Sequence, residues 1–211
     1  MNVANQVPDI VVGRLPLYLR ALTNLEAQGQ LITSSKELAG ILGSSAAQIR
    51  KDLSHFGEFG KQGTGYHITY LIIQLRQILQ ADEAWDVVLV GAGDLGHALL
   101  RNQGIARRGY RIVAAFDNNH ERIGTRVGNV IIQNSGRMLD EIQQLQIKLA
   151  IIAVPPPAAQ VVSDTLVKAG IKAILNYSPI AISAPSDVQV QTIDPVAQMQ
   201  HMTYYLRDNE I

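Results

Sequence analysis

The chain has 211 residues, enough for one large domain or two modest ones. Hydrophobic residues make up 47% of it, but no uninterrupted apolar run approaches the 18 residues or so of a membrane-spanning helix. Cysteine is absent, which excludes disulfides, thiolate metal sites and thiol redox switches. Together with the lack of a signal-peptide pattern in residues 1–8, this predicts a cytoplasmic protein.

The formal net charge is zero, which by itself does not favour a nucleic-acid partner. The charge is slightly uneven: residues 1–80 hold seven Lys/Arg and five Asp/Glu, whereas residues 81–211 hold eleven and thirteen. A specific DNA-binding protein needs basic groups on one surface rather than a high total. The overall charge therefore leaves DNA binding open.

Helical spacing of apolar residues predicts a first helix over residues 15–26. A capping-box pattern at residues 33–37 precedes a second helix over residues 36–42. Gly43 ends that helix, and Ser44 or Ser45 caps a third helix over residues 46–56. Two helices separated by a glycine turn indicate a helix-turn-helix, whose second helix enters the DNA major groove.

The polar side of the third helix suits DNA. Its Gln and Arg/Lys side chains can make bidentate contacts to base edges, and its Ser and Lys side chains can contact phosphates. The alternative is that Arg50–Asp52 is only a solvated helix surface. The predicted DNA-binding residues here are Ser44, Ser45, Gln48, Arg50, Lys51, Ser54 and His55.

A glycine-rich turn with a basic tip follows at residues 59–66 and indicates a β-hairpin wing. Lys61 and Tyr66 of this wing complete the predicted DNA-binding set. A helix over residues 67–79 leads to a linker at residues 80–83. The sequence therefore predicts a winged-helix DNA-binding domain over residues 1–80.

The periodicity changes after Trp85, because short apolar runs now recur with helical stretches between several of them. Such alternation predicts an α/β domain with a doubly wound parallel sheet, here over residues 84–192. The runs are 87–90, 112–116, 130–132, 149–154, 171–175 and 188–193.

The first of these runs leads into a Gly-x-Gly-x-x-Gly motif, Gly91 to Gly96, and a helix over residues 95–100. Asp117 ends the second strand, 21 residues beyond Gly96. In a Rossmann fold the glycines allow a tight turn, close approach of a pyrophosphate and helix packing, and the acidic residue binds the ribose 2′-hydroxyl. The pattern predicts NADH/NAD⁺ binding and disfavours the 2′-phosphate of NADP(H).

Two later strands end in residues 154–157 and 176–179, which fall at the carboxyl edge of the sheet, where ligands bind. They are predicted to flank the nicotinamide, although Pro156 and Pro157 also suit a rigid turn. The predicted cofactor-binding residues are Gly91, Gly93, Asp94, Leu95, Gly96, Asp117, Asn118, Val154, Pro155, Asn176 and Ser178.

No catalytic machinery is recognisable. The chain has no P-loop, no Tyr with Lys four positions on, and no His pair at convincing metal-ligand spacing, so no catalytic or metal-binding residue is assigned. The part after the predicted sheet is too short for a substrate domain, which favours a binding protein over an enzyme. Two alternatives stay open: an unusually short NAD-dependent oxidoreductase, and a DNA-binding regulator that responds to another nucleotide such as CoA.

The last segment, residues 193–211, begins with Asp194 as an N-cap and Pro195 at the first helical position. The helix is expected to run to about Leu206, with Val196 and Met199 on its apolar side. It needs a partner surface, either its own sheet or a second subunit, and the sequence leaves both open.

Six stretches of the chain carry a resemblance to a known family: Gln48–Ser54, Phe56–Gly57, Gly63–Tyr66, Gly91–Gly96, Phe116–Asp117 and Gly170–Asn176. Through them the chain resembles the Rex family of redox-sensing transcriptional repressors over nearly its whole length. The resemblance implies a homodimer that forms through the Rossmann domain and a domain-swapped C-terminal helix. It also implies binding to a palindromic operator and release when NADH binds, with NAD⁺ a weaker, opposing ligand.

By the same resemblance, Asp194 faces Arg20 of the partner subunit and reports domain closure. Two positions depart from the family pattern. Gln62 stands in the wing where the family usually has Arg, and Asn102 stands after the glycine motif where it often has Tyr. These departures bear on minor-groove contact and on the response to NADH, respectively.

Overall fold

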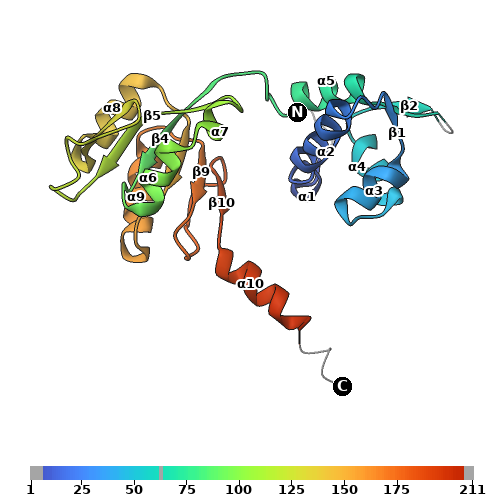
Figure 1. Cartoon of the computed structure of the whole chain (residues 1–211). Helices are drawn as coiled ribbons and strands as arrows, with labels where there is room; N and C mark the ends of the chain where they lie inside the picture. Colours follow the sequence, from blue (N-terminus) through green and yellow to red (C-terminus); the bar gives the residue numbers. More distant parts are fainter. Residues whose placement is uncertain (1–6, 62–63, 207–211) are drawn as a thin grey trace. The chain divides into compact units, whose positions relative to one another are not determined.

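The computed structural model describes residues 7–61 and 64–206, and the chain divides between Glu83 and Ala84 into two compact units (Figure 1). Within the described residues, no helix is long and apolar enough to cross a membrane.

The first unit has the helix-turn-helix and wing that the sequence predicts. The wing is an antiparallel hairpin in which Gly60 pairs with Tyr66. A further strand, β1, pairs with β3, so the sheet order is β1-β3-β2; two residues are too few to give a periodic signal. The described elements are α1 (Asp9–Val12), α2 (Leu15–Ala27), β1 (Ile32–Thr33), α3 (Ser35–Leu42), α4 (Ala46–Ser54), β2 (Gly60–Lys61), β3 (Gly65–His67) and α5 (Ile68–Ile78).

Local capping fixes the turn between α3 and α4. The Ser34 hydroxyl accepts a hydrogen bond from the Glu37 N–H at 3.1 Å and starts α3, and Gly43 ends it at a φ of 63°. Ser45, rather than Ser44, caps α4 by accepting from the Gln48 N–H at 3.1 Å. The helix-turn-helix is confirmed, with α4 ending two residues earlier than predicted.

One hydrophobic core joins these helices. Leu22 of α2, Leu38 of α3, Ile49 of α4 and Leu71 of α5 are all fully buried in the same cluster. The second helix of the helix-turn-helix, α4, which is called the recognition helix below, is therefore held against the other three helices by apolar packing.

The second unit is built on a seven-stranded sheet of order β10-β9-β8-β4-β5-β7-β6. Its six parallel strands follow the 3-2-1-4-5-6 order of a dinucleotide-binding fold. The predicted doubly wound parallel sheet is confirmed, with one addition: the two-residue edge strand β6 runs antiparallel to β7, which makes the sheet mixed. The described elements are β4 (Trp85–Val90), α6 (Asp94–Arg101), α7 (Gln103–Ala106), β5 (Tyr110–Asp117), β6 (Arg126–Val127), β7 (Val130–Asn134), a 3-10 turn (Ser135–Arg137), α8 (Met138–Leu145), β8 (Leu149–Ile152), α9 (Pro156–Lys168), β9 (Ala173–Asn176), β10 (Gln189–Thr192) and α10 (Pro195–Tyr204).

The central strand β4 is buried on both faces. Val88 and Val90 pack in one cluster with residues of α8 and α9, while Val87 and Leu89 pack in another with Leu99 of α6. Because successive strand side chains point to opposite faces, an unbroken apolar run is what a sheet covered on both sides requires.

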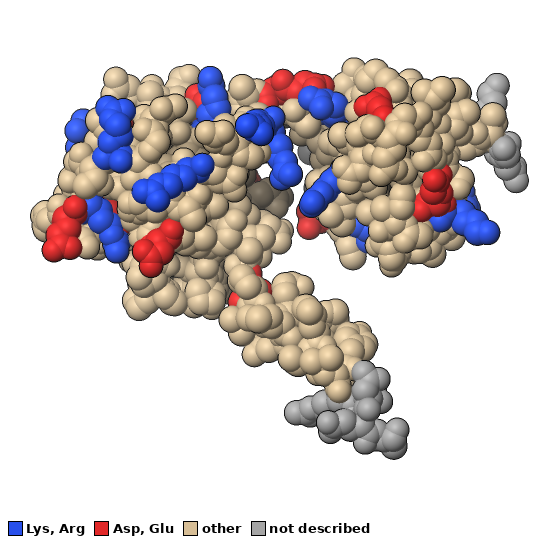
Figure 2. All heavy atoms as spheres, in the orientation of Figure 1, with Lys and Arg blue, Asp and Glu red and all other residues tan. Residues whose placement is uncertain are grey.

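The C-terminal helix α10 begins as predicted. The Asp194 carboxylate accepts hydrogen bonds from the N–H groups of Val196 and Ala197 at 2.9 and 3.3 Å. No residue of α10 is buried, and Met199 and Met202 are 54% and 65% exposed. Figure 2 shows the helix without Lys, Arg, Asp or Glu side chains. Packing on its own sheet, one of the two arrangements left open, is therefore not observed.

Candidate nucleic-acid interface and dinucleotide site

The recognition helix α4 presents most of its predicted DNA-binding side chains to solvent. Its inward side buries Ile49 and Leu53. Arg50 also donates a hydrogen bond to the Ser35 hydroxyl at 3.0 Å, which links α4 to the start of α3. The exposed members of the predicted set are Ser44, Ser45, Arg50, Lys51, Ser54 and His55, and Gln48 is half-buried.

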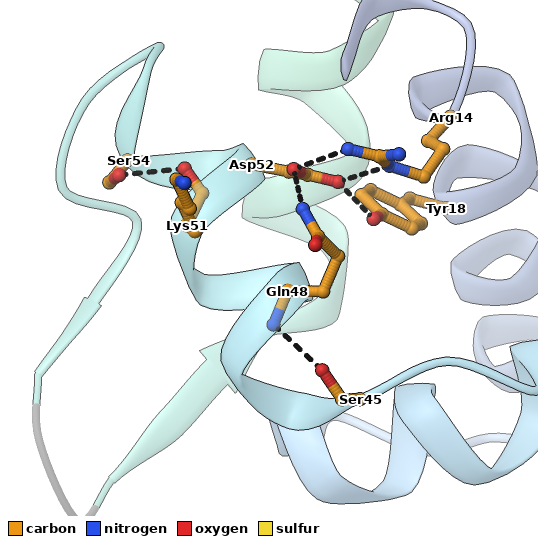
Figure 3. A network of polar contacts seen from close by, with 7 residues as sticks. All are labelled: Arg14, Tyr18, Ser45, Gln48, Lys51, Asp52 and Ser54. Atoms are coloured by element: carbon orange, nitrogen blue, oxygen red, sulfur yellow. Dashed lines mark hydrogen bonds and ion pairs between the residues drawn. The ribbon is translucent and has the colours of Figure 1, made fainter. Parts of the chain in front are cut away.

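Asp52 is a residue of α4 whose burial the sequence analysis did not predict. It is 0% exposed, so the alternative of a solvated surface at Arg50–Asp52 is wrong at this position. Arg14 binds its carboxylate through Nε at 2.6 Å and Nη2 at 2.8 Å, and the Tyr18 hydroxyl donates to it at 2.5 Å (Figure 3). Gln48 Nε2 donates to it at 2.6 Å from within α4. The first unit thus has a polar network beneath its recognition helix.

These contacts keep Asp52 ionised. Burial by itself raises the pKa of Asp52, but the hydrogen bonds from Arg14, Tyr18 and Gln48 outweigh it and hold that pKa below its ordinary value. Burial, reinforced by the neighbouring carboxylate, raises the pKa of Tyr18 to about 12. At neutral pH the network therefore holds an acceptor-only carboxylate and a protonated phenol.

The wing is described only in part. Lys61 lies in β2, while its side chain and Gln62 fall outside the described residues. The half-buried ring of Tyr66 lies over Gly60, where an added Cβ would be 3.0 Å from the ring. Burial raises the pKa of Tyr66, which therefore stays neutral at physiological pH.

In the second unit the glycine motif joins β4 to α6 under tight steric limits. Gly91 has a φ of +97°, and an added Cβ would lie 2.3 Å from the Ala153 carbonyl oxygen. A Cβ on Gly96 would lie 2.1 Å from the Gly91 carbonyl oxygen. Gly93 differs, because the nearest atoms are the Arg122 guanidinium nitrogens at 3.8 and 4.0 Å. Gly91 and Gly96 serve the fold, and Gly93 leaves its space open to a ligand.

Asp117 ends β5 beside this motif and is buried. Its carboxylate accepts from the N–H groups of Ala92 at 2.7 Å and Asn119 at 2.8 Å, and Arg122 Nη1 lies 3.3 Å away. Burial alone raises the pKa of Asp117, but these donors outweigh it and lower that pKa. The carboxylate is therefore ionised and tied to the glycine loop.

Arg122 is a candidate site residue that the sequence did not reveal. It lies between Asp117 and the open side of Gly93, where a phosphate or ribose of a dinucleotide would arrive. The only available signal is a lone Arg five residues beyond the acidic strand end, which is too common to be selective.

The remaining predicted cofactor residues lie along the same sheet edge. Register places Val90, Phe116, Ile152 and Asn176 side by side on β4, β5, β8 and β9. The loops that follow these strands contain the predicted residues Gly91, Gly93, Asn118, Val154, Pro155 and Ser178, and the first turn of α6 contains Asp94, Leu95 and Gly96.

Asn176 and Ser178 stabilise the carboxyl edge of the sheet through hydrogen bonds. Asn176 Nδ2 donates to the carbonyl oxygens of Ser178 and Ile180, each at 3.0 Å, and its Oδ1 accepts from the Ser178 N–H at 2.9 Å. The Ser178 hydroxyl donates to the Val154 carbonyl oxygen. Both side chains are buried and already partnered, so they shape the edge that would receive a ligand.

The predicted switch residues belong to different units. Arg20 is exposed on α2, and Asp194 caps α10. Their pairing between two subunits stays a prediction. Asn102 is exposed and accepts from the Gly104 N–H at 2.9 Å, which starts α7.

Comparison with known proteins gives two family models. Residues 6–54 match the model described as "Putative DNA-binding protein N-terminus", and residues 82–180 match the model described as "CoA binding domain". The first match lies within the first unit, and the second lies almost entirely within the second unit.

Curated relatives match along the whole chain. A protein of Chloroflexus aggregans named "Redox-sensing transcriptional repressor Rex" is 49% identical over 206 residues, covering 98% of this chain and 97% of that protein. A protein of the same name from Brevibacillus brevis is 44% identical over 201 residues, covering 95% and 97%.

Solved structures match equally fully. The crystal structure of RSP in complex with beta-NAD⁺ and operator DNA has a TM-score of 0.90 at 34% identity, covering 97% of this chain and 94% of that one. RSP in complex with beta-NADH has a TM-score of 0.89 at 32% identity, covering 98% and 97%.

Proposed function

The chain belongs to the Rex family of redox-sensing transcriptional repressors, and from this premise we propose how its two units work together. It is a DNA-binding repressor that senses NADH, and it is a regulator, not an enzyme. The observation that carries this function is the presence, in one chain, of a winged helix and a dinucleotide fold that match relatives solved with operator DNA and with NADH.

The first unit binds the operator through α4 and the wing. The exposed side of α4 carries Arg50 and Lys51, which are suited to base edges and phosphates. The protein works in the cytoplasm, because its target is operator DNA.

The second unit binds NADH at the carboxyl edge of its sheet. The N-terminus of α6 and the open side of Gly93 receive the pyrophosphate, and Asp117 holds the adenosine ribose with Arg122 beside it. The ionised Asp117 disfavours the 2′-phosphate of NADPH.

The active species is a homodimer in which α10 packs on the second copy. Its exposed Val196, Met199 and Met202 and its lack of charge support a protein partner surface. Two recognition helices about 34–36 Å apart fit a palindrome with one DNA turn between half-sites. NADH releases the operator because it binds the arrangement that cannot engage DNA more tightly, and only such differential affinity shifts an equilibrium.

Paired variants of the full chain test this division of labour. Gly93→Val is expected to fold and bind the operator but to lose its NADH response, because the added side chain fills the pyrophosphate space. Lys51→Ala is expected to bind NADH normally while operator affinity falls by about tenfold or more. If either variant lost both activities while remaining folded, the assignment of one activity to each unit would be wrong.

CoA is the alternative nucleotide for this site, because residues 82–180 match the model described as "CoA binding domain". CoA carries a phosphate on its adenosine ribose, which the ionised Asp117 would repel. CoA at millimolar concentration is therefore expected not to displace NADH. Displacement by CoA at micromolar concentration would transfer the sensing role to that nucleotide.

A further inference from the structure

The carboxylate of Asp52 has no acceptor capacity left. An ionised carboxylate offers about four acceptor positions. Arg14 fills two of them, Tyr18 fills one and Gln48 fills the fourth, two on each oxygen. Figure 3 shows Arg14 and Tyr18 approaching Asp52 from one side while Gln48 reaches it along α4.

This arrangement fixes the side chain of Gln48. The backbone N–H of Gln48 is held by the Ser45 hydroxyl at 3.1 Å, and its side-chain nitrogen is held by Asp52 at 2.6 Å. Because an ionised carboxylate can only accept, the amide of Gln48 must turn its nitrogen, not its oxygen, toward Asp52. The flip that exchanges amide oxygen and nitrogen is thereby excluded in the folded unit.

Gln48 retains the groups that read a base. It is the third residue of α4, in the N-terminal part of a recognition helix that contacts base edges. One of its two side-chain N–H groups is given to Asp52, which leaves the other N–H and the carbonyl oxygen. That donor–acceptor pair matches the N7 and N6 groups of adenine in the major groove.

We propose that Asp52 is a positioning residue for base recognition, which orients the amide of Gln48 so that this side chain reads an adenine in each half-site. Asp52 does not touch DNA and acts through Gln48. The proposal rests on the DNA-binding function proposed above and adds to it a residue that determines specificity.

The test uses the full chain and the duplex that it selects from a random library. Each adenine of that duplex is replaced in turn by 7-deazaadenine, which lacks the N7 acceptor and still pairs normally, and binding is measured by fluorescence anisotropy at fixed salt. The native protein is expected to lose about tenfold or more in affinity at one adenine per half-site. Gln48→Ala is expected to bind less tightly overall and to lose this discrimination.

Asp52→Asn separates the proposal from a purely structural role. Its side-chain amide can donate to Gln48 and permits the flipped orientation, so discrimination at that adenine is expected to fall to near onefold. Adding Asp52→Asn to Gln48→Ala is expected to change that discrimination no further. Tyr18→Phe is the matched control, because it removes one hydrogen bond from Asp52 and leaves the contact with Gln48 in place.

Uniformly weaker binding of Asp52→Asn with native discrimination at every adenine would overturn the proposal and leave the proposed function intact. Failure of the native chain to select any duplex would overturn both. If Asp52→Asn does not fold, the side-chain amide of Gln48 is observed by NMR in the free native protein. One N–H with exchange slowed about tenfold relative to an exposed glutamine supports the proposal, and two rapidly exchanging N–H groups overturn it.

Discussion

At the scale of single residues, buried carboxylates organise both candidate sites. Asp52 is held by Arg14, which directly precedes α2, and by side chains of α2 and α4. Asp117 is held mainly by backbone N–H groups of the glycine loop and of its own turn. Each has a pKa below its ordinary value, because its donors outweigh the cost of burial. Both carboxylates are therefore reliable negative charges at physiological pH.

The positions of Asp117 and Arg122 lead to a prediction about how substitution of Asp117 changes the preference for NADH over NADPH. Asp117→Asn removes the charge that repels a 2′-phosphate while keeping the shape of the side chain. Because Arg122 stays nearby to bind that phosphate, the preference for NADH over NADPH is expected to fall by about tenfold or more. Fluorescence titrations with NADH and with NADPH measure this preference as the ratio of the two affinities.

The matched control adds Arg122→Met to Asp117→Asn. Without the guanidinium, NADPH is expected to lose the affinity that it gained. Equal NADPH binding with and without Arg122 would show that this side chain does not face the adenosine ribose.

Asp52 also predicts a pH dependence of stability in the first unit. Its folded pKa lies below the ordinary value of 3.8, so its stabilising contribution is fully present above that value. This contribution is lost as the pH falls through the folded pKa. Hydrogen exchange of α4 amides, followed by mass spectrometry from pH 5 to pH 3, is expected to show protection falling at the acid end.

In Asp52→Asn this acid loss is expected to be smaller, with lower protection already at pH 5, because no carboxylate remains to be protonated. A native-like acid loss in the variant would assign the titration to another carboxylate of the unit.

The same residues show why the sequence predicted one part of the sites and missed another. The roles of Gly91 and Gly96 follow from a fixed spacing between a strand and a helix, which is local in the chain. The buried network around Asp52 was not predicted, because its partners Arg14 and Tyr18 lie 38 and 34 residues away in the chain. Such pairings are set by tertiary packing and have no periodic signature.

At the scale of elements, the caps made the helix-turn-helix predictable. Ser34 caps the N-terminus of α3 and Ser45 caps that of α4, each by a local hydrogen bond, and Gly43 ends α3 in a left-handed backbone conformation. The two-residue strands β1 and β6 were missed, because they depend on pairing with β3 and β7. Of these two strands, β6 makes one edge of the sheet in the second unit antiparallel.

The exposed apolar side of α10 leads to a prediction about the oligomeric state of the protein. Met199→Glu combined with Met202→Glu places two charges on its exposed apolar side, where burial against a second copy would be costly. Light scattering coupled to size exclusion is expected to give twice the chain mass of 23.0 kDa for the native protein and the chain mass itself for the variant.

Ala197→Glu serves as the control, because this exposed position lies about 100° around the helix from Val196. It is expected to remain dimeric. A dimeric Met199→Glu/Met202→Glu protein would show that α10 is not needed for the association.

At the scale of the whole molecule, the order of the two units could be predicted from the sequence. The change from helical periodicity to alternating strands and helices falls near Trp85, and the structure divides between Glu83 and Ala84. The communication between the units is not local in sequence. In the proposed dimer it depends on a second copy of the chain and on the ligand, so it has to be measured in the assembled protein.

The most direct measurement is fluorescence anisotropy of a labelled operator duplex bound to the full chain at fixed salt, titrated with NADH and separately with NAD⁺. The account predicts release by NADH at concentrations at which NAD⁺ leaves the complex intact. Tight NADH binding without any change in operator affinity would contradict it, because the ligand would then not distinguish the two arrangements of the dimer.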